Sequence, residues 1–467
     1  MKHCFLWATR QVRGSRLARN RQKFYWDGGP IHMMDLTKLV RTAGTGALAA
    51  SALAGVMMLS TAARADGSLK DMAAPSSWWD SVKFSGYIEG GGLGNPGRDR
   101  DPNQINWGHL FTDKNDNVQL NQLSLTLERP IDSKKSYDVG FKFQSMFGSD
   151  ARYTHFLGEL DRVTSDKEQF DIVEAWLQFH TPWLGEGGTD IKVGQYVTLE
   201  GAEVIDPRGN FFYSHSYIFN FGIPFKHTGI LAATHVSSML DLYYGVDTGV
   251  NTTFGERGDN NDAVAFHGGF GLNLMNGDLT ILATTHIGPE NADEIETVPA
   301  VPVPGANSSL RYLSDITAVW KASKALTFNA DLNYIRDDLF NADGYGAAGY
   351  VSYALNDNLS FGLRGEVWRD SKGFFVGAFP GNLDFVNAEI GRPNTSISLF
   401  PQGTTYVAIT AGMNIKPTVD KRFEGLVVRP EVRWDHSSDA TPFNGGTDDD
   451  QFTVGADVVV PFSIISP

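Results

Sequence analysis

The chain has 467 residues, of which 42% are hydrophobic and 20% are charged, and it carries a formal net charge of −15 at pH 7. So acidic a chain is a poor candidate for binding nucleic acid, because phosphates are recognised by Lys and Arg. The only cysteine is Cys4, which excludes a disulfide within the chain and any metal site built from several thiolates.

The N-terminal segment has the features of a targeting sequence. Lys38 and Arg41 precede a small-residue apolar run, and an A-x-A cleavage motif follows at residues 63–65. We therefore predict a signal peptide over residues 33–65 that is cleaved after Ala65, with a retained membrane anchor as the alternative.

A basic stretch, residues 1–32, lies ahead of this segment and precedes plausible start residues at Met33 and Met34. We interpret it as an upstream extension that results from a mis-called start codon; an extended signal peptide is the alternative. Loss of residues 1–65 removes Cys4, ten of the 39 basic residues and two of the 54 acidic residues. The 29 basic and 52 acidic residues that remain give a net charge of −23.

Residues 66–81 are expected to form a short periplasmic lead, and sixteen segments of alternating apolar and polar residues follow it. In the last segment, one face would carry Phe452, Val454, Ala456, Val458, Val460 and Phe462. The other face would carry Thr453, Gly455, Asp457 and Val459. About ten such alternating residues between turns are typical of a transmembrane β-strand. The expected strands begin near Val82, Val118, Ser136, Phe170, Thr189, Lys226, Asp241, Asp262, Leu279, Leu310, Leu326, Gly344, Asn358, Thr404, Leu426 and Gln451.

The connectors between these segments alternate between short and long. Among the short ones, Asn276-Gly277 is a strong signal for a two-residue hairpin turn. The long ones are 95–117, 150–169, 200–225, 252–261, 291–308, 337–343, 371–403 and 439–450. Because only helices and closed barrels satisfy every backbone group in lipid, and no apolar run after residue 65 reaches about 20 residues, a barrel is favoured. The predicted fold of residues 82–467 is all-β: a transmembrane antiparallel up-and-down β-barrel of about 16 strands, with long extracellular loops and short periplasmic turns.

The alternation also assigns strand residues to a lipid face or an interior face. The lipid face is predicted to include Val139, Phe141, Phe143, Val173, Ala175, Leu177, Phe179, Val407, Ile409, Ala411 and Met413. Seven basic residues are assigned to the interior: Lys83, Lys142, Lys192, Arg311, Arg364, Arg429 and Arg433. Eleven acidic residues join them: Glu89, Asp138, Glu174, Asp241, Asp247, Asp315, Asp331, Glu366, Glu431, Asp435 and Asp457. An ion on the lipid face costs about 2–4 kcal/mol at mid-membrane, so this segregation indicates a water-filled interior.

One long connector, residues 198–225, differs from the others in its aromatic content. It contains Phe211, Phe212, Tyr213, Tyr217, Phe219, Phe221 and Phe225. An exposed loop of this kind would present a large apolar patch, so we expect residues 200–225 to fold into the barrel. The pore constriction is then predicted to consist of Glu200, Glu203, Asp206 and Arg208. The alternative is that the aromatic side chains cap the extracellular rim or contact a neighbouring subunit.

The same region carries a resemblance to a known family. The matching residues are Gly194-Gln-Tyr196, Glu203, Asp206-Pro207, Asn210-Phe211, Tyr213-Ser214, Tyr217, Phe219, Gly222 and residues 224–229, with residues 84–88 near the start and 429–435 near the end. Through them the chain resembles the OmpL-like beta-barrel porin-2 family over nearly the whole mature chain. The resemblance implies an outer-membrane porin, but it brings no defined substrate and no residue-level mechanism.

Other motifs favour a structural interpretation. Gly344-Tyr-Gly346-Ala-Ala-Gly349 matches a dinucleotide-binding pattern, but it opens an expected strand where the mechanism needs a strand before it and a helix after it. Residues 113–117 are acidic enough to hold calcium loosely, yet they lack the Gly and Glu of an EF-hand loop. The histidines show no paired spacing, and His215 and His227 are expected to form hydrogen bonds in or beside the 198–225 loop. No cofactor, metal site or catalytic group is predicted.

The predicted function is a porin, a water-filled channel for passive diffusion of small hydrophilic solutes or ions, and not an enzyme. Its expected partners are outer-membrane lipid, the barrel-assembly machinery and the diffusing solutes, and analogy suggests a homotrimer. The acidic excess inside suggests a mild preference for cations or neutral solutes. Two alternatives stay open: a barrel hydrolase, which needs a Ser and His paired on the outer wall, and a secreted soluble β-sandwich that binds glycans, which needs polar outward faces.

Overall fold

The computed structural model describes residues 78–97, 105–156, 160, 167–254, 260–295, 299–377, 402–419 and 423–465. The expected upstream extension, the signal peptide with its cleavage site after Ala65, and most of the periplasmic lead lie outside these residues. Within the described part of the chain, no helix is long and apolar enough to cross a bilayer.

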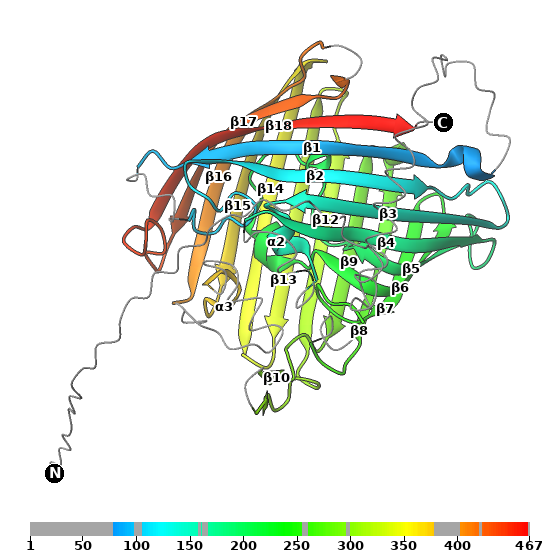
Figure 1. Cartoon of the computed structure of the whole chain (residues 1–467), viewed down its shortest axis with the longest axis horizontal. Coiled ribbons are helices and arrows are strands. Elements are labelled where there is room, and N and C mark those ends of the chain that lie inside the picture. Colours follow the sequence, from blue (N-terminus) through cyan, green and yellow to red (C-terminus); the bar gives the residue numbers. More distant parts are fainter. Residues whose placement is uncertain are drawn as a thin grey trace, which may run out of the picture. The chain divides into compact units, whose positions relative to one another are not determined.

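Sixteen antiparallel strands close into one barrel, in which neighbours in the chain pair with each other and the last strand pairs with the first (Figure 1). The barrel strands are β1 (Lys83–Gly94), β2 (Asn117–Arg129), β3 (Asp138–Gly148), β4 (Gln169–Thr181), β5 (Thr189–Val197), β6 (Lys226–Ser237), β7 (Leu240–Asp247), β8 (Ala265–Leu274), β9 (Leu279–Gly288), β12 (Arg311–Lys321), β13 (Leu326–Asp337), β14 (Ala342–Asn356), β15 (Leu359–Asp370), β16 (Thr404–Ile415), β17 (Val427–Ser437) and β18 (Asp450–Ile465). The predicted fold class is confirmed, and every strand begins within three residues of its expected start. Because the sheet closes on itself, the soluble β-sandwich alternative is wrong.

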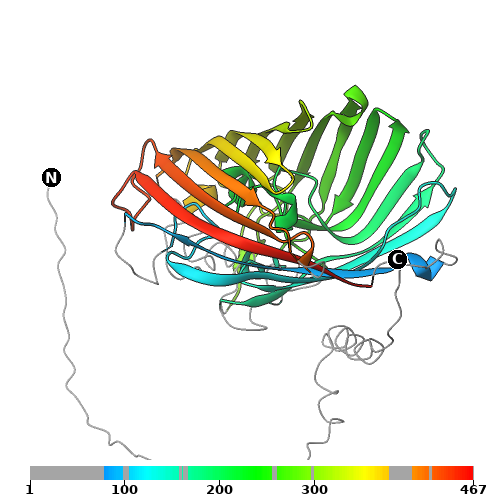
Figure 2. The same cartoon turned by 90° about the horizontal axis from the view of Figure 1, so that it is seen from above.

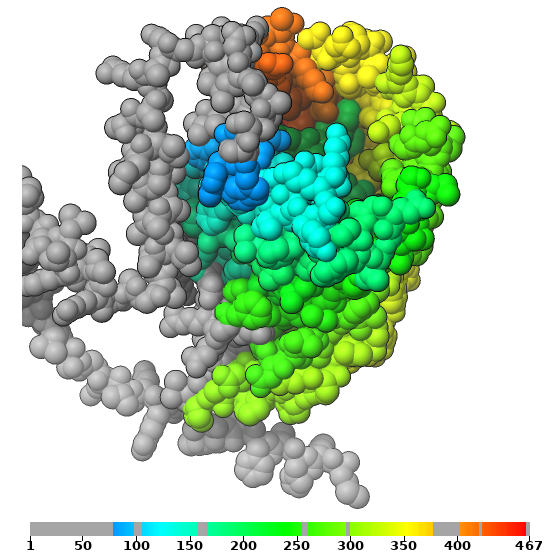
Figure 3. Space-filling view, turned by 90° about the vertical axis from the view of Figure 1, so that its right-hand side faces the viewer, coloured from blue at the N-terminus to red at the C-terminus, as the bar shows by residue number. Residues whose placement is uncertain are grey.

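Apart from a short helical segment ahead of β1, the remaining secondary structure of the described residues lies in the connectors. A separate two-stranded pair, β10 (Glu294–Ile295) and β11 (Val301–Pro302), lies between β9 and β12. The short helical segments are η3 (Trp78–Ser81), α2 (Ala151–Thr154), η4 (Pro207–Gly209), η5 (Ile218–Gly222), η6 (Met275–Gly277) and α3 (Phe374–Gly377). The strands curve around connector segments that lie inside the ring (Figure 2). Viewed from the end with the short turns, a recess opens between the blue and cyan strands and the orange and yellow ones (Figure 3).

Alternating side chains explain why these segments form a barrel wall. Along β17, the interior-facing Arg429 and Arg433 are buried, whereas Val432 and Trp434 are 41% and 37% exposed on the outer surface. A strand places successive residues on opposite faces, so between Arg429 and Asp435 the charged residues lie on one face and the apolar residues on the other. The apolar set forms the outer surface of the barrel.

One residue that the alternation assigns to the lipid face lies inside. Val173 is 2% exposed and belongs to the interior apolar cluster. The pairing of β3 with β4 shifts register between Gln144 and Ser145, and this bulge leaves Val173 without a partner residue. An extra residue in one strand breaks the period of two, so the outward assignment of Val173 is wrong. Leu177 and Phe179, beyond the bulge, are exposed as expected.

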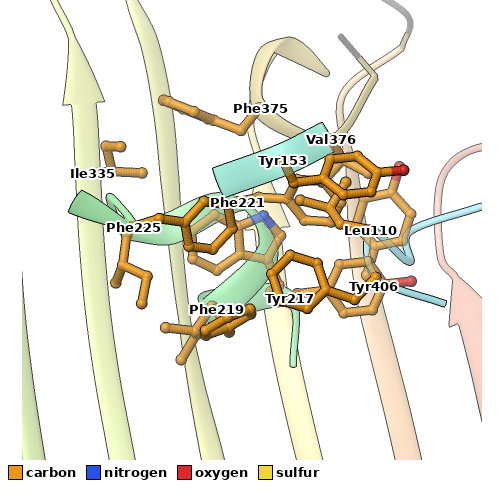
Figure 4. Packing of buried hydrophobic residues seen from close by; sticks show 14 of the residues in the cluster. Leu110, Tyr153, Tyr217, Phe219, Phe221, Phe225, Ile335, Phe375, Val376 and Tyr406 are labelled. Atoms are coloured by element: carbon orange, nitrogen blue, oxygen red, sulfur yellow. The ribbon is translucent and has the colours of Figure 1, made fainter. Parts of the chain in front are cut away.

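A cluster of buried apolar residues lies inside the barrel (Figure 4). It joins Leu110 and Phe111 of the first long connector to Phe219 and Phe221 of residues 198–225 and to Trp368 on the inner face of β15. The rings of Phe111 and Phe219 meet edge to face with centroids 5.4 Å apart. Burial of each large apolar side chain stabilises by about 1.5–3 kcal/mol, which favours the inward course of both connectors.

Candidate functional site: the barrel interior

The connector between β5 and β6, residues 198–225, crosses the barrel interior and is called the inner loop below. Gly201 donates its backbone N–H to Asp315 of β12, and Ala202 donates its own to Asp331 of β13, both at 2.9 Å. These contacts lie more than 100 residues apart in sequence. The inner loop therefore extends from its own strands across the interior to β12 and β13.

The interior face of β17 holds the middle of the inner loop. Arg429 donates to the carbonyl oxygens of Pro207 and Asn210 at 2.7 and 2.9 Å. Two positions further, the Glu431 carboxylate accepts the backbone N–H of Tyr213 at 2.9 Å. Hydrogen bonds to a charged group contribute about 1.5–3 kcal/mol each, so these contacts fix the loop firmly.

The same face of β17 continues the series. Arg433 donates to the carbonyl oxygen of His215 at 2.5 Å, and the Tyr217 hydroxyl donates to Asp435 at 3.2 Å. Residues on one face of a strand recur every second position, so the strand's own period spaces the four wall contacts. Residues 207–217 thus run alongside β17.

The neighbouring strand β15 adds an ion pair. Arg364 lies 2.7 Å from Glu203 of the inner loop and donates to the carbonyl oxygen of Ser214 at 2.8 Å. Glu366 accepts the backbone N–H of Tyr217 at 2.6 Å. Arg364 is completely buried, and loss of its partner would leave an uncompensated charge inside the barrel.

Two glycines on the inner wall make room for aromatic side chains of the loop. Gly362 and Gly412 are paired across β15 and β16. A Cβ atom on Gly362 would lie 2.2 Å from Phe211, and one on Gly412 would lie 3.2 Å from Phe212. The wall is therefore flat where Phe211 and Phe212 pack against it.

Burial and charge set the ionisation of two inner-loop groups. Burial lowers the pKa of His215 to about 4, so its ring is neutral at pH 7. Burial acts to raise the pKa of Glu203, but the Arg364 guanidinium outweighs it and holds this pKa below its ordinary value. The Glu203–Arg364 pair is thus ionic at neutral pH.

The four residues predicted to form the constriction occupy two different environments. Glu200 and Glu203 are 2% and 6% exposed and contact protein groups. The side chains of Asp206 and Arg208 are 32% and 40% exposed, and they pair at 2.6 Å. The Arg208 guanidinium also lies 4.5 Å from the ring centre of Tyr87 on β1. Only the Asp206–Arg208 pair presents charge to open space.

Six of the charged residues that the sequence assigns to the interior divide in the same way. Five are at most 6% exposed because the inner loop covers them: Arg364, Glu366, Arg429, Glu431 and Arg433. The Lys142 side chain of β3 keeps 22% exposure while it pairs with Glu174 at 2.5 Å. Nearby, the Lys192 ammonium of β5 lies 4.8 Å from the ring centre of Trp176. The solvated part of the interior therefore includes the β3–β5 wall.

Acidic and amide side chains of residues 113–117, the segment that could hold calcium, form ion pairs and hydrogen bonds within the protein. The Asp113 carboxylate pairs with Arg152 at 2.7 Å, and the Asn115 side-chain oxygen accepts the backbone N–H of Asn95 at 2.7 Å. The Arg152 and Lys114 cations outweigh burial and lower the pKa of Asp113. These groups hold the first long connector in place.

Sequence reasoning missed a cluster of three histidines. The ring centre of His227 on β6 lies 4.6 Å from those of His267 on β8 and His286 on β9. The expectation that His227 lies beside the inner loop and forms a hydrogen bond is correct, since its Nε2 lies 3.1 Å from the Thr198 hydroxyl. The sequence feature that could have revealed the cluster is one inward-facing histidine near the same end of each of these three strands.

Comparison with known proteins agrees with this architecture. A family model described as "Putative beta-barrel porin-2, OmpL-like" matches residues 81–462. Among solved structures, the chain is similar to an anion-selective porin from Comamonas acidovorans, with 11% identity, a TM-score of 0.50, and coverage of 82% of this chain and 99% of that chain. It is also similar to the outer membrane channel DcaP of Acinetobacter baumannii, with 13% identity, a TM-score of 0.49, and coverage of 84% and 100%. No curated protein matched the chain.

Proposed function

Because the chain belongs to the OmpL-like beta-barrel porin-2 family, and so is a channel of the bacterial outer membrane, we propose that small hydrophilic solutes or ions cross it passively beside the inner loop. One observation carries this proposal. The inner loop is fastened along β12, β13, β15 and β17, while charges on the β3–β5 wall keep contact with solvent.

The inner loop bounds the narrow part of the channel in this proposal. Asp206 and Arg208 supply the charges that a passing solute meets, whereas Glu200 and Glu203 act within the protein. Fixed charges act strongly on an ion at short range. Because this pair has opposite signs and the buried arginines face carboxylates, selectivity is mild, with a preference for cations or neutral solutes from the acidic excess.

The proposal includes the absence of enzymatic activity. The alternative, a barrel hydrolase, would hydrolyse ester or peptide substrates at a rate that depends on a Ser and a His of the outer wall. Folded protein in detergent micelles, incubated with chromogenic esters and peptides, separates the two functions. Turnover above that of heat-unfolded protein would contradict the passive channel.

We extend the proposal to assembly. The exposed apolar outer face supports insertion by the barrel-assembly machinery and association into a homotrimer, for which sixteen strands are a typical size. Native mass measurement of the detergent-extracted protein decides the oligomeric state. A monomer at all detergent concentrations would leave the channel proposal intact and remove the trimer.

Planar-bilayer conductance tests the channel itself. Purified protein should give stepwise, ohmic conductance, and deletion of residues 204–216 should raise each step and weaken discrimination by solute size. Deletion of residues 294–302 is the matched control, because Val303 donates its backbone N–H to Asp293 at 2.6 Å and the chain can close there. Silent bilayers, with barrel folding shown by circular dichroism, would contradict the proposal.

A further inference from the structure

A buried cluster of histidines and carboxylates lies where the inner loop leaves the wall. It draws on four adjacent strands, β6 to β9, and on the connectors beside them. Its members are Glu200, His227, Asp247, His267, His286 and Glu290. All of them are at most 3% exposed.

Two of the histidines turn Nε2 toward Glu200. His267 Nε2 lies 3.0 Å from Glu200 Oε1, and His227 Nε2 lies 4.0 Å from Glu200 Oε2. The Thr198 hydroxyl donates to Glu200 Oε2. Although these two atoms lie within ion-pair distance, their orientation leaves both Glu200 Oε1 and His267 Nε2 without a hydrogen bond among the described residues, and both atoms are fully buried. A cation held between them would satisfy both.

The opposite nitrogens of the same rings face a second carboxylate. Asp247 Oδ2 lies 3.4 Å from His227 Nδ1 and 3.9 Å from His267 Nδ1. Within the described residues, all three atoms are buried without a hydrogen-bond partner. The other oxygen, Asp247 Oδ1, lies 3.0 Å from His286 Nε2. A carboxylate behind the imidazole is the usual way to orient a metal-binding histidine.

We propose that Glu200, His227 and His267 bind a divalent transition metal of the Zn²⁺ class through the Glu200 carboxylate and the two Nε2 atoms. Asp247 orients both rings from behind. Two imidazoles and one carboxylate suit Zn²⁺, Co²⁺ or Cu²⁺, whereas Ca²⁺ and Mg²⁺ take oxygen ligands. The Thr198 hydroxyl, 3.1 Å from His227 Nε2, lies beside the same site.

The site joins two parts of the chain. Glu200 belongs to the inner loop, whereas His227 and His267 belong to the wall strands β6 and β8. A metal ion bound here fastens the start of the inner loop to the wall on the side opposite to its β15 and β17 contacts. This role is independent of which solute the channel passes.

Metal content and ligand-field spectra of the full-length purified protein test the site. Chelator-treated protein reloaded with Zn²⁺ should retain about one ion per chain after dialysis, and the Co²⁺ form should show the visible absorption of a low-coordinate site. Glu200→Gln and His267→Gln should abolish uptake, and Asp247→Asn should weaken affinity about 10–100-fold. His180→Gln is the control, since His180 is a buried interior histidine that pairs with Asp190 at 2.6 Å, away from this site.

Two results overturn the proposal. The first is folded wild-type protein that takes up neither Zn²⁺ nor Co²⁺. The second is a His267→Gln variant that takes up as much metal as the wild type. Either result means that Glu200, His227 and His267 do not form a metal site. Heat-modifiable gel migration shows whether each variant folds. If either ligand variant does not fold, the Cu²⁺-loaded wild type decides, because its electron paramagnetic resonance spectrum must show two imidazole nitrogens; fewer nitrogens contradict the assignment.

Discussion

The wall that meets the inner loop and the wall of β3 to β5 follow the same alternating pattern but use their interior faces differently. On β15 and β17, Arg364 and Arg433 are completely buried and bind the inner loop. On β3, the Lys142 side chain pairs with a neighbour on the wall and keeps 22% exposure. Alternation thus decides which face a residue occupies, but not what covers that face.

The two walls should also differ in energetics. A buried ion pair that loses one member leaves an uncompensated charge, which costs about 3–5 kcal/mol, whereas a solvated pair contributes about 0–1 kcal/mol. Changes on the β15 and β17 wall should therefore alter stability. Changes on the β3–β5 wall should alter conduction instead.

The largest effect is expected for Glu431→Ala. It removes the acceptor of the buried backbone N–H groups of Tyr213 and Ser214, and each unsatisfied group costs about 1–3 kcal/mol, so unfolding free energy should fall by about 3–5 kcal/mol. Asp241→Asn on β7 is the control, since Asp241 is a partly exposed interior acid paired with His235. Urea titrations in lipid vesicles measure both, and equal losses would remove the distinction between interior acids that bind the inner loop and interior acids that do not.

Acid should loosen the inner loop through His215. Burial lowers its pKa to about 4 from an ordinary value of 6.5, so the unfolded chain binds the proton more readily. The contribution of the neutral His215 ring to the unfolding free energy is complete above pH 6.5 and is lost as the pH falls toward 4, on the order of 3 kcal/mol in all. The neighbouring charges that face the ring are Glu203, Arg364 and Arg429. Measurement of the unfolding free energy between pH 4 and pH 7 tests this. In His215→Phe this part of the pH dependence should vanish, and a pH dependence equal to that of the wild type would assign it to other groups.

A moderate loss of stability is expected when a side chain is added to the wall glycine against which Phe211 packs. Gly362→Val places side-chain atoms against Phe211, and overpacking of this kind costs about 1–3 kcal/mol. Gly365→Ala on the same strand is the control, because nothing lies within 4 Å of its added Cβ. Thermal unfolding of the two variants should separate them clearly, and equal midpoints would place Phe211 away from the wall.

The smallest effect on stability is expected for Lys192→Gln. The ammonium lies over the Trp176 ring on the partly solvated wall, so unfolding free energy should change by about 0.5 kcal/mol or less. Loss of this positive charge should shift the reversal potential in a KCl gradient toward cation selectivity. Lys134→Gln in an exposed turn should leave the potential unchanged. A shift in both variants would reflect overall charge rather than the channel wall.

The sequence predicted the wall well because each strand carries its own periodic signal. Arg429, Glu431 and Arg433 were assigned to the interior from spacing alone, and they lie there. Val173 was assigned wrongly because a bulge breaks the period, and a bulge depends on the partner strand as well as on local sequence. The strand starts needed no such partner information.

Contacts between segments that lie far apart in the sequence could not be predicted from the sequence. The aromatic content of residues 198–225 indicated an inward course, but not that Glu431 and Arg364 would bind the loop backbone. The cluster of His227 and His267 was missed for the same reason, since sheet pairing rather than sequence spacing brings its members together. Whether the predicted constriction residues narrow the channel stays a prediction.

Thiol modification of Arg208→Cys tests most directly whether the inner loop bounds the channel. Arg208 is the most exposed of the four predicted constriction residues, and the expected mature chain contains no other cysteine. A bulky charged thiol reagent added to open channels should lower the conductance of Arg208→Cys in discrete steps, while Lys134→Cys in an exposed turn conducts as before. Full modification of Arg208→Cys, shown by mass, with unchanged conductance would place the inner loop outside the conduction path.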